Sequence, residues 1–372
     1  MEYKALGELC DVVSGGTPSR SKQEYWNGDI PWIKIGNIKS KYVSEADEFI
    51  TEAGLSGSSA KMLKKGTILY TIFATLGEAG VLTIDACTNQ AIAGITIKDE
   101  SVIDRDYLFY YLKSKKKYVN KVGRGVAQNN INMSILRGFE VPIRKLHEQQ
   151  EITNILDKTS SIIEDRRQEL EKLDELIKAR FVEVFGNPVT NDKGWSTDSC
   201  KNLMKKIGSG ATPKGGRESY CDEGISLIRS MNVYNNRFAY KDLAHITDEQ
   251  AEQLDNVTIE KSDVLLNITG ASVARCCVVP DDLLPARVNQ HVSIIRCKEN
   301  LLPEFVCSMF TEDNYQRLLW NIATAGGATR EAITKQQIED LQLIVPPLDL
   351  QKQFMEFVNQ VDKSKVVALK AA

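Results

Sequence analysis

The residues best able to hold a ligand occur in a small polar loop that appears twice in the chain. Ser14-Gly-Gly-Thr-Pro-Ser-Arg20 returns 195 residues later as Ser209-Gly-Ala-Thr-Pro-Lys214. Each loop gathers hydroxyls, backbone N–H groups and a cation, a combination that can hold a phosphate of a nucleic-acid backbone. The same residues are also typical of a turn that caps a following helix, so both interpretations stay open.

Amide and guanidinium side chains recur beside expected strand ends. Lys34 with Asn37 returns as Arg229 with Asn232. An Asn side chain can bond adenine through two hydrogen bonds, and an Arg side chain can bond guanine in the same way. The densest amide cluster is Gln128-Asn-Asn-Ile-Asn132, which follows Gly123-Arg-Gly125. This cluster could contact bases, or it could form an Asx turn that caps a helix.

Catalytic and metal-binding patterns are missing from the sequence. The three histidines, at positions 147, 245 and 291, have no metal-ligand spacing, so we expect them to have structural or surface roles. No G-x-x-x-x-G-K-[ST] loop or complete dinucleotide fingerprint is present. The eight cysteines form no C-x-x-C pair and are expected to be buried, reduced thiols. No Ser-His-Asp or Cys-His set can be nominated.

The elements that position these residues are also duplicated. The offset of 195 carries Tyr25 onto Tyr220, and with slight drift Asn89-Gln90 corresponds to Asn289-Gln290 and Gln149 to Gln351. Strand composition over 31–35, 67–73, 80–84 and 91–97 is repeated over 225–229, 263–268, 275–279 and 291–296. Each set is followed by one expected helix, over 106–118 and over 303–322. A mixed α/β domain used twice is predicted.

Between the two copies lies the clearest helix, from Leu146 to Phe185, which contains no Gly or Pro. Apolar residues recur in it every seven positions, a spacing that requires a partner helix lying nearly parallel or antiparallel. They are Leu156, Ile163, Leu170, Ile177 and Val184. Gly186-Asn-Pro188 ends the helix. The helical pattern that closes the second copy is the expected mate, but it loses its phase after Asp362; two separately packed helices are the alternative.

Charge is spread unevenly along a chain whose net charge is −3. The first copy is basic, whereas the long helix and the second copy are acidic. This balance excludes a strongly basic nucleic-acid binder but allows local basic surfaces. The N-terminus does not look like a signal peptide and no apolar run reaches the length of a membrane span, so we expect a cytoplasmic protein with no membrane contact.

Taken together, the quoted stretches resemble the specificity subunits of type I restriction–modification systems. The first copy opens with "Ser-Gly-Gly-Thr-Pro … Ile-Pro-Trp-Ile-Lys" and closes with "Gly-Arg-Gly-Val-Ala-Gln-Asn-Asn-Ile-Asn … Phe-Glu-Val-Pro-Ile … Glu-Gln-Gln-Glu-Ile". The second opens with "Ser-Gly-Ala-Thr-Pro … Ile-Ser-Leu-Ile-Arg" and closes with "Leu-Ile-Val-Pro-Pro-Leu … Gln-Lys-Gln-Phe". The resemblance covers essentially the whole chain.

The resemblance implies an α/β (α+β) chain of two pseudo-symmetric target recognition domains joined by long antiparallel coiled-coil-like helices. The implied limits are residues 1–145 for the first domain, 146–186 for a spacer helix, 187–347 for the second domain and 348–372 for a second, short helix. Each domain would read one half of a bipartite double-stranded DNA target. The helices would set the gap and dock methyltransferase subunits, and restriction subunits would join for cleavage.

The resemblance also implies a chain that is not an enzyme and carries no cofactor. S-adenosylmethionine, ATP and Mg²⁺ are expected on the partner subunits, and no metal is expected here. The partner-docking helix would present Leu156, Ile163, Leu170 and Ile177. The expected DNA contacts are Ser14, Gly16, Thr17, Arg20, Lys34, Asn37, Arg124, Gln128, Asn129, Thr212, Lys214, Arg217, Arg229, Asn232, Arg237 and Arg330. In the acidic second domain the DNA face is expected to be a local patch of Lys205, Lys206, Lys214, Arg217, Arg229 and Arg237.

Two departures leave other functions open. The second domain has Thr329-Arg-Glu331 where the first has its Gln-Asn-Asn cluster, and the second helix is short. The chain could therefore be an interaction scaffold that no longer reads DNA. It could also be a recognition module split from a fused methyltransferase–nuclease, in which case the purified chain would bind S-adenosylmethionine.

Overall fold

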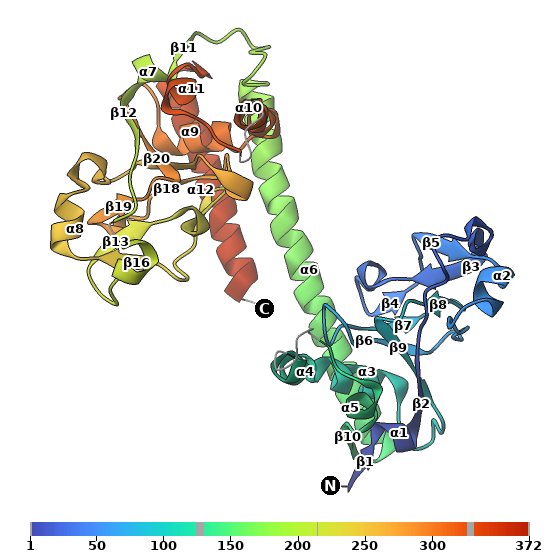
Figure 1. Cartoon of the computed structure of the whole chain (residues 1–372). Coiled ribbons are helices and arrows are strands. Elements are labelled where there is room, and N and C mark those ends of the chain that lie inside the picture. The colour runs from blue at the N-terminus through green and yellow to red at the C-terminus, as the bar shows by residue number, and fades with distance from the viewer. Residues whose placement is uncertain (1, 124–129, 214, 326–330, 371–372) are drawn as a thin grey trace. The chain divides into compact units, whose positions relative to one another are not determined.

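The computed structural model describes residues 2–123, 130–213, 215–325 and 331–370. The chain divides into two compact units, Met1–Glu164 and Asp165–Ala372, each described separately below. The division falls inside the long helix α6 (Leu146–Phe185), so each unit contains part of it (Figure 1). In the part of the chain that the structure describes, no helix is long and apolar enough to cross a bilayer.

The first unit is built on a five-stranded sheet with the order β2-β9-β6-β7-β4. Its strands are β2 (Cys10–Ser14), β4 (Tyr42–Val43), β6 (Ile68–Thr71), β7 (Ala79–Leu82) and β9 (Ile92–Ile97). Every residue of β6 and β7 is buried, which explains why these strands read as continuous apolar runs. β6 pairs antiparallel with both β7 and β9. These central strands lie within the predicted ranges 67–73, 80–84 and 91–97 except for one residue of β7.

Two smaller sheets and five short α-helices complete the first unit, together with its part of α6. The three-stranded sheet has the order β5-β3-β8, and the two-stranded sheet joins β1 to β10. The strands are β1 (Glu2–Ala5), β3 (Trp26–Ile33), β5 (Glu48–Ile50), β8 (Cys87–Thr88) and β10 (Glu140–Ile143). The helices are α1 (Leu6–Leu9), α2 (Glu52–Ser56), α3 (Arg105–Ser114), α4 (Lys116–Gly123) and α5 (Met133–Arg137). The helix predicted over 106–118 is therefore two helices, because α3 ends at Ser114.

The second unit repeats this plan with a four-stranded sheet of order β12-β20-β17-β18 and a three-stranded sheet of order β16-β13-β19. The strands of these two sheets are β12 (Met204–Ser209), β13 (Ile225–Ile228), β16 (Ala244–Ile246), β17 (Val264–Asn267), β18 (Cys276–Val278), β19 (Ala286–Val288) and β20 (Val292–Cys297). In both units the central strand of the small sheet has one antiparallel and one parallel neighbour. The duplication predicted from the sequence is therefore a duplication of the fold.

Short strands and helices close the second unit. The remaining strands are β11 (Thr197–Ser199), β14 (Val233–Tyr234), β15 (Arg237–Phe238) and β21 (Gln342–Ile344). The helices are α7 (Cys200–Leu203), α8 (Asp248–Glu252), α9 (Pro303–Phe310), α10 (Asp313–Thr324), α11 (Lys335–Glu339) and α12 (Leu348–Lys370). The helix predicted over 303–322 is interrupted at Thr311-Glu312, where the buried Glu312 carboxylate accepts the N–H groups of Asn314 and Tyr315 and starts α10.

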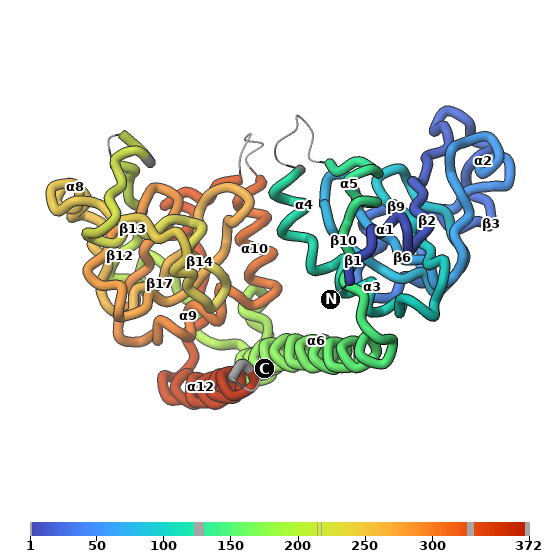
Figure 2. The backbone as a smooth tube through the Cα atoms, turned by 90° about the horizontal axis from the view of Figure 1, so that it is seen from below, coloured from blue at the N-terminus to red at the C-terminus, as the bar shows by residue number. Residues whose placement is uncertain are grey.

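Helix α12 packs against the second-unit part of α6, and both views show the two helices side by side (Figure 1, Figure 2). The Phe354 ring lies 5.6 Å from that of Phe181 and 5.4 Å from that of Phe185. Lys365, eleven residues further along α12, bonds Asp174, which lies earlier in α6, at 2.6 Å. The two helices therefore run antiparallel, as predicted.

The phase of α12 corrects the sequence analysis. Phe354, Val361 and Ala368 are spaced seven residues apart, and all three are buried. The row of buried residues therefore continues past Asp362, where the sequence pattern loses its phase. The reason is that small Ala368 and the aliphatic stem of Lys365, whose side chain is only 19% exposed, occupy positions where a heptad pattern has large apolar residues.

Candidate nucleic-acid interface

Equivalent glutamines fasten the two helices to their domains. Gln149 is fully buried; its Oε1 accepts the N–H of Asp104, and its Nε2 donates to the carbonyls of Val102 and Arg144. Gln351 does the same in the second unit, with Leu302, Asn300 and Pro346. The recurrence of Gln149 as Gln351 is thus explained by one side chain that satisfies three backbone groups at the start of a helix.

The glycine-rich loop of the first unit is packed into the scaffold. The N–H of Gly15 donates to Ile92 O at 3.0 Å and that of Gly16 to Thr88 O at 2.9 Å. The Trp32 indole N–H donates to Gly16 O, and a Cβ on Gly16 would lie 2.3 Å from the backbone of Ser59-Ala60. The expected contact of Gly16 with a phosphate is therefore wrong, because this residue is buried and its N–H is already bonded to Thr88 O. Glycine is needed here because the backbone of Ser59-Ala60 approaches closely.

The threonines of both loops bond residues of the repeated Asn-Gln pair. Thr17 donates its hydroxyl hydrogen to Gln90 Oε1, and Thr212 donates to Gln290 Oε1. Ser14, at the end of β2, pairs with Ala93 of β9. These contacts hold the loops against their sheets, so they account for the recurrence of Thr17 and Thr212 without a ligand.

The repeated turn after β3 and after β13 is likewise held by its asparagine. The Oδ1 atom of Asn37 accepts the N–H of Lys34 at 2.9 Å, and that of Asn232 accepts the N–H of Arg229 at 3.1 Å. Asn232 is completely buried, and its Nδ2 donates to the carbonyl of Ala239 at 2.9 Å. The expected contact of Asn232 with a base is therefore wrong, because both ends of its amide form hydrogen bonds inside the protein.

Two expected DNA-binding cations of the first unit share one carboxylate. Arg20 and Lys34 bond Glu48 at 2.6 and 2.5 Å. The bond from Lys34 contributes most to lowering the pKa of Glu48. With the bond from Arg20 it outweighs the opposite effect of desolvation, so the pKa lies below its usual value. The Arg20 guanidinium also lies 3.7 Å from the centre of the Trp26 ring. Arg20, whose side chain is 57% exposed, is therefore pre-oriented at the surface with one net positive charge left on the trio.

In the second unit the nominated cations differ in accessibility. The Arg229 side chain donates to the Asp242 carbonyl and lies over the Tyr220 ring, so it is engaged in protein contacts. Arg237 is exposed, with its guanidinium 4.8 Å from the centre of the Tyr234 ring. Lys205 bonds Glu299, which reduces its free positive charge. Expected contacts at Arg124, Gln128, Asn129, Lys214 and Arg330, and the side chain of Arg217, lie outside the described residues.

A groove beside Arg237 is not indicated by any repeated residue of the sequence. Its volume is about 730 Å³. It is lined by Ser230, Met231, Tyr234, Thr269, Gly270, Ala271, Ser272, Arg275, His291, Glu331 and Ala332. Most of these residues do not recur between the copies, so a search for repeated residues passes over them.

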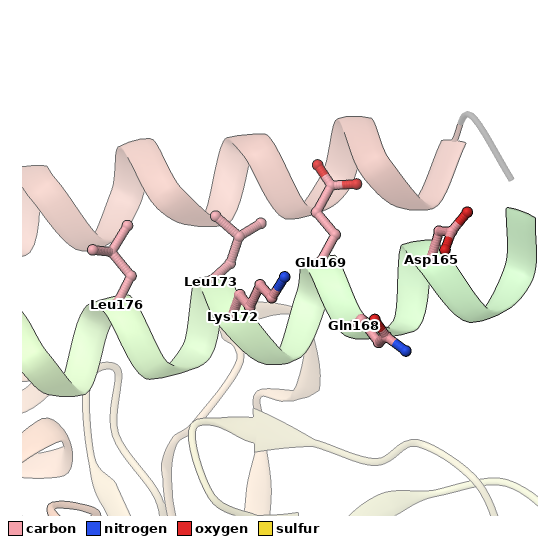
Figure 3. Close-up of a pocket in the computed structure, with 6 residues that line it drawn as sticks. All are labelled: Asp165, Gln168, Glu169, Lys172, Leu173 and Leu176. Atoms are coloured by element: carbon pink, nitrogen blue, oxygen red, sulfur yellow. The ribbon is translucent and has the colours of Figure 1, made fainter.

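The expected docking stripe of α6 is covered to different degrees. Leu156 and Leu170 are half-buried, and Ile177 packs against the second-unit core, whereas Ile163 is 57% exposed. Ile155 and Ile162, seven residues apart, are 64% and 50% exposed. In the second unit, Leu173 and Leu176 point toward α12 beside a shallow groove that Asp165 and Glu169 also line (Figure 3).

No cluster of His, Cys, Asp or Glu able to hold a metal ion occurs within residues 2–123, 130–213, 215–325 and 331–370. All eight cysteines are free thiols. Burial raises the pKa of the Cys10 and Cys200 thiols to about 12, so neither is a ready nucleophile.

Comparison with known proteins agrees with the duplicated fold. The family model described as "Type I restriction modification DNA specificity domain" matches residues 1–173 and again 192–371. The specificity subunit of the type I restriction enzyme MjaIX from Methanocaldococcus jannaschii is 27% identical over 96% of this chain and 86% of its own length. The EcoR124I/EcoR124II specificity subunit from Escherichia coli is 30% identical over 46% of this chain and 45% of its own length.

Solved structures share the fold. The type I restriction–modification S subunit from M. genitalium has a TM-score of 0.57 at 13% identity and covers 100% of this chain and 91% of its own. A chain from a study of complex assembly and conformational transition of the type I restriction–modification system has a TM-score of 0.56 at 15% identity, covering 100% of this chain and 92% of its own.

Proposed function

Because the chain belongs to the family of type I restriction–modification DNA specificity subunits, we propose that each of its two units reads one half of a bipartite double-stranded DNA target. The observation that carries this proposal is the duplication of one domain: the same sheets, the same Thr–Gln bonds and the same buried helix-anchoring glutamine occur in both units. A molecule with two copies of a recognition domain suits a target with two parts.

The DNA contacts we propose are nominated cations of the two units, of which Arg20 and Arg237 are exposed. In the first unit they are Arg20 and Lys34, and in the second they are Arg237 and Arg229. Arg20 and Arg237 are each placed by an aromatic ring, which fixes the planar guanidinium and lowers the entropy lost on binding a base edge or phosphate. The expected contacts outside the described residues stay part of the proposal.

Helix α6 would dock the methyltransferase subunits. The support is an exposed aliphatic row, Ile155, Ile162 and Ile163, on its first-unit part. Large apolar side chains exposed in a row on a helix mark a protein contact. Restriction subunits would then join the assembly for cleavage. S-adenosylmethionine, ATP and Mg²⁺ would be bound by these partners, since this chain would supply recognition and no chemistry.

Sequencing of modified adenines tests the proposal. The chain and the methyltransferase subunits of its own system are expressed together in a host that lacks adenine methylation, and separately in control cells. We expect methyladenine in one motif of two parts with a fixed gap, and none when the chain is expressed alone. Methylation by the chain alone, or a methylated motif with a single undivided part, would contradict the proposal.

A further inference from the structure

Equivalent positions in the two units can be identified from their backbone hydrogen bonds. Ile72 N–H donates to Ala91 O at 2.9 Å, and Ile268 N–H donates to His291 O at 3.0 Å. Residue 73 forms an isolated bridge with Asn130, as Thr269 does with Ala332. Position 91 of the first unit is thus position 291 of the second, and position 73 is position 269.

A third equivalent position follows from the neighbouring strands. The N–H of Thr71 donates to Glu78 O at 2.9 Å, and that of Asn267 donates to Arg275 O at 2.8 Å. Gly77, just before Glu78, and Ala274, just before Arg275, both have positive φ, 82° and 70°. Position 78 therefore corresponds to position 275.

The side chains at these three positions differ between the units although the backbone bonds are the same. The first unit has Phe73, Glu78 and Ala91. The second has Thr269, Arg275 and His291, and all three line the groove beside Arg237. An aromatic residue is exchanged for a hydroxyl, a carboxylate for a guanidinium and a methyl group for an imidazole. Two domains that share a scaffold but read different sequences must differ where they touch the bases.

The groove side chains of the second unit are held in place. Thr269 Oγ1 and His291 Nδ1 are 2.6 Å apart, so the hydroxyl fixes the ring and leaves Nε2 as the outer nitrogen. The Arg275 guanidinium lies 4.6 Å from the centre of the Tyr234 ring, and that of Arg237 lies 4.8 Å from the same centre. Pre-oriented imidazole and guanidinium groups are suited to contacting base edges.

We infer that His291 and Arg275 are specificity-determining residues that contact base edges of the second half-target, and that Thr269 is a positioning residue for His291. The inference rests on the proposed function, because it requires that this unit reads DNA. It also revises the sequence analysis, in which His291 was expected to have a structural or surface role. The alternative is that a loop of a partner protein, and not DNA, occupies this groove.

The experiment selects bound sequences from a randomised duplex library with the full chain in complex with its methyltransferase subunits. We expect His291→Ala to reduce the preference at one or two adjacent base pairs of the second half by about tenfold or more, with the first half and the gap unchanged. Arg275→Ala should relax a different, nearby position. Thr269→Val should resemble His291→Ala, while Thr269→Ser, which keeps the hydroxyl, should restore the parent motif.

The matched control is His245→Ala, which removes another half-buried histidine of the same unit, on β16 outside the groove. It should leave the motif unchanged. Thermal unfolding checks that each variant is folded, and the half-exposed site of His291 makes its truncation tolerable. If a folded His291→Ala or Arg275→Ala complex selects the parent motif unchanged, or loses methyltransferase binding instead, the inference is overturned. A wild-type complex that selects no sequence would instead refute the proposed function.

Discussion

Thr17 donates its hydroxyl hydrogen to Oε1 of Gln90, a residue 73 positions further along the chain. The equivalent bond joins Thr212 to Gln290 in the second unit. In each unit the asparagine that precedes this glutamine donates its backbone N–H to the small sheet, Asn89 to Ile33 O and Asn289 to Ile228 O. The most visible repeated motif of the sequence thus forms hydrogen bonds that hold a loop to the sheet beside it.

Removing the bond between Thr212 and Gln290 should lower the stability of the second unit and leave the DNA target unchanged. Thr212→Val deletes one hydrogen bond at nearly constant volume, so we expect the free energy of unfolding of the second unit to fall by about 1 kcal/mol. Urea unfolding of the full chain measures the loss, and methylation sequencing of the complex reads the target. Arg237→Ala is the control, with unchanged stability and weaker DNA binding. A new motif from Thr212→Val would make this threonine a base contact after all.

Asn232 provides a stronger test of the distinction between scaffold and interface. Asn232→Ala would leave the N–H of Arg229 and the carbonyl of Ala239, both in half-buried residues, without their side-chain partner. A buried polar group left unpaired costs about 1–3 kcal/mol, so we expect a loss within that range in the free energy of unfolding. Asn37→Ala, at the half-buried equivalent position, should cost less. Chemical denaturation compares the two, and equal small losses would contradict the assignment.

These cases show what could be predicted from one sequence. The bounds of α6 were predicted to the residue because the segment lacks Gly and Pro and ends at Gly186, whose φ of +74° suits a glycine stop. The duplication was also predicted. The breaks that divide α3 from α4 and α9 from α10 were missed; in the second, the start of α10 is capped by Glu312, a residue type without a strong capping signature.

Repetition in the sequence is a weaker guide to the candidate site than to the fold, for a physical reason. Residues that recur between divergent copies include those that the common fold requires, and Gly16, Thr212 and Asn232 all form hydrogen bonds within it. Base contacts must differ between copies that read different sequences. His291 and Arg275 therefore carry no repeat signal, and their neighbourhood became visible only when hydrogen bonds aligned the two units.

Charges within the first unit predict a pH-dependent attachment of α3 to α6. Lys41 bonds Asp106 at 3.1 Å and Asp157 at 2.6 Å. Burial alone would raise the pKa of Asp106, but hydrogen bonds from Arg105 and Lys41 outweigh it and hold the pKa below 3.8. A depressed carboxyl pKa contributes stability above the unfolded pKa, and this contribution is lost as the pH falls through the folded value.

A double-mutant cycle of Lys41→Met and Asp106→Asn measures this contribution. We expect a coupling free energy of about 1–2 kcal/mol at pH 7, since both side chains are less than 20% exposed, and a coupling that falls as the pH drops through the folded pKa of Asp106, which lies below 3.8. The pKa of Lys41 is raised above 10.5, because bonds to Asp157 and Asp106 outweigh its burial, so the alkaline loss should begin only above that pH. A coupling that stays constant while Asp106 becomes protonated would rule out the ion pair as its source.

The exposed aliphatic row of α6 predicts a defect in assembly without a defect in folding. Ile155→Asp with Ile162→Asp places two charges in the proposed methyltransferase contact, so the partner should no longer co-purify with the chain. Because both side chains are at least half exposed, thermal unfolding of the chain alone should change little. Val189→Asp, a substitution of another exposed aliphatic residue outside α6, is the control. Normal co-purification of the double variant would move the docking surface elsewhere.

The last prediction concerns the length of α6, in which the chain passes from one unit to the other. Seven residues inserted between Glu164 and Asp165 would keep the seven-residue apolar spacing and add about 10.5 Å of helix. At about 3.4 Å per base pair this equals roughly three base pairs of duplex. We expect the gap of the methylated motif to lengthen by roughly one to three base pairs, because bending of protein or DNA would absorb the accompanying rotation.

A four-residue insertion at the same place is the matched comparison. It adds about 6 Å but rotates the apolar residues on one side of the insertion relative to those on the other, so we expect weakened partner docking instead of a regular change of gap. Methylation sequencing of cells that carry each variant reads the gap, and co-purification reads docking. A stable, active seven-residue variant with the parent gap would show that helix length does not set the spacing of the two half-targets, which would then have to be imposed by the methyltransferase subunits.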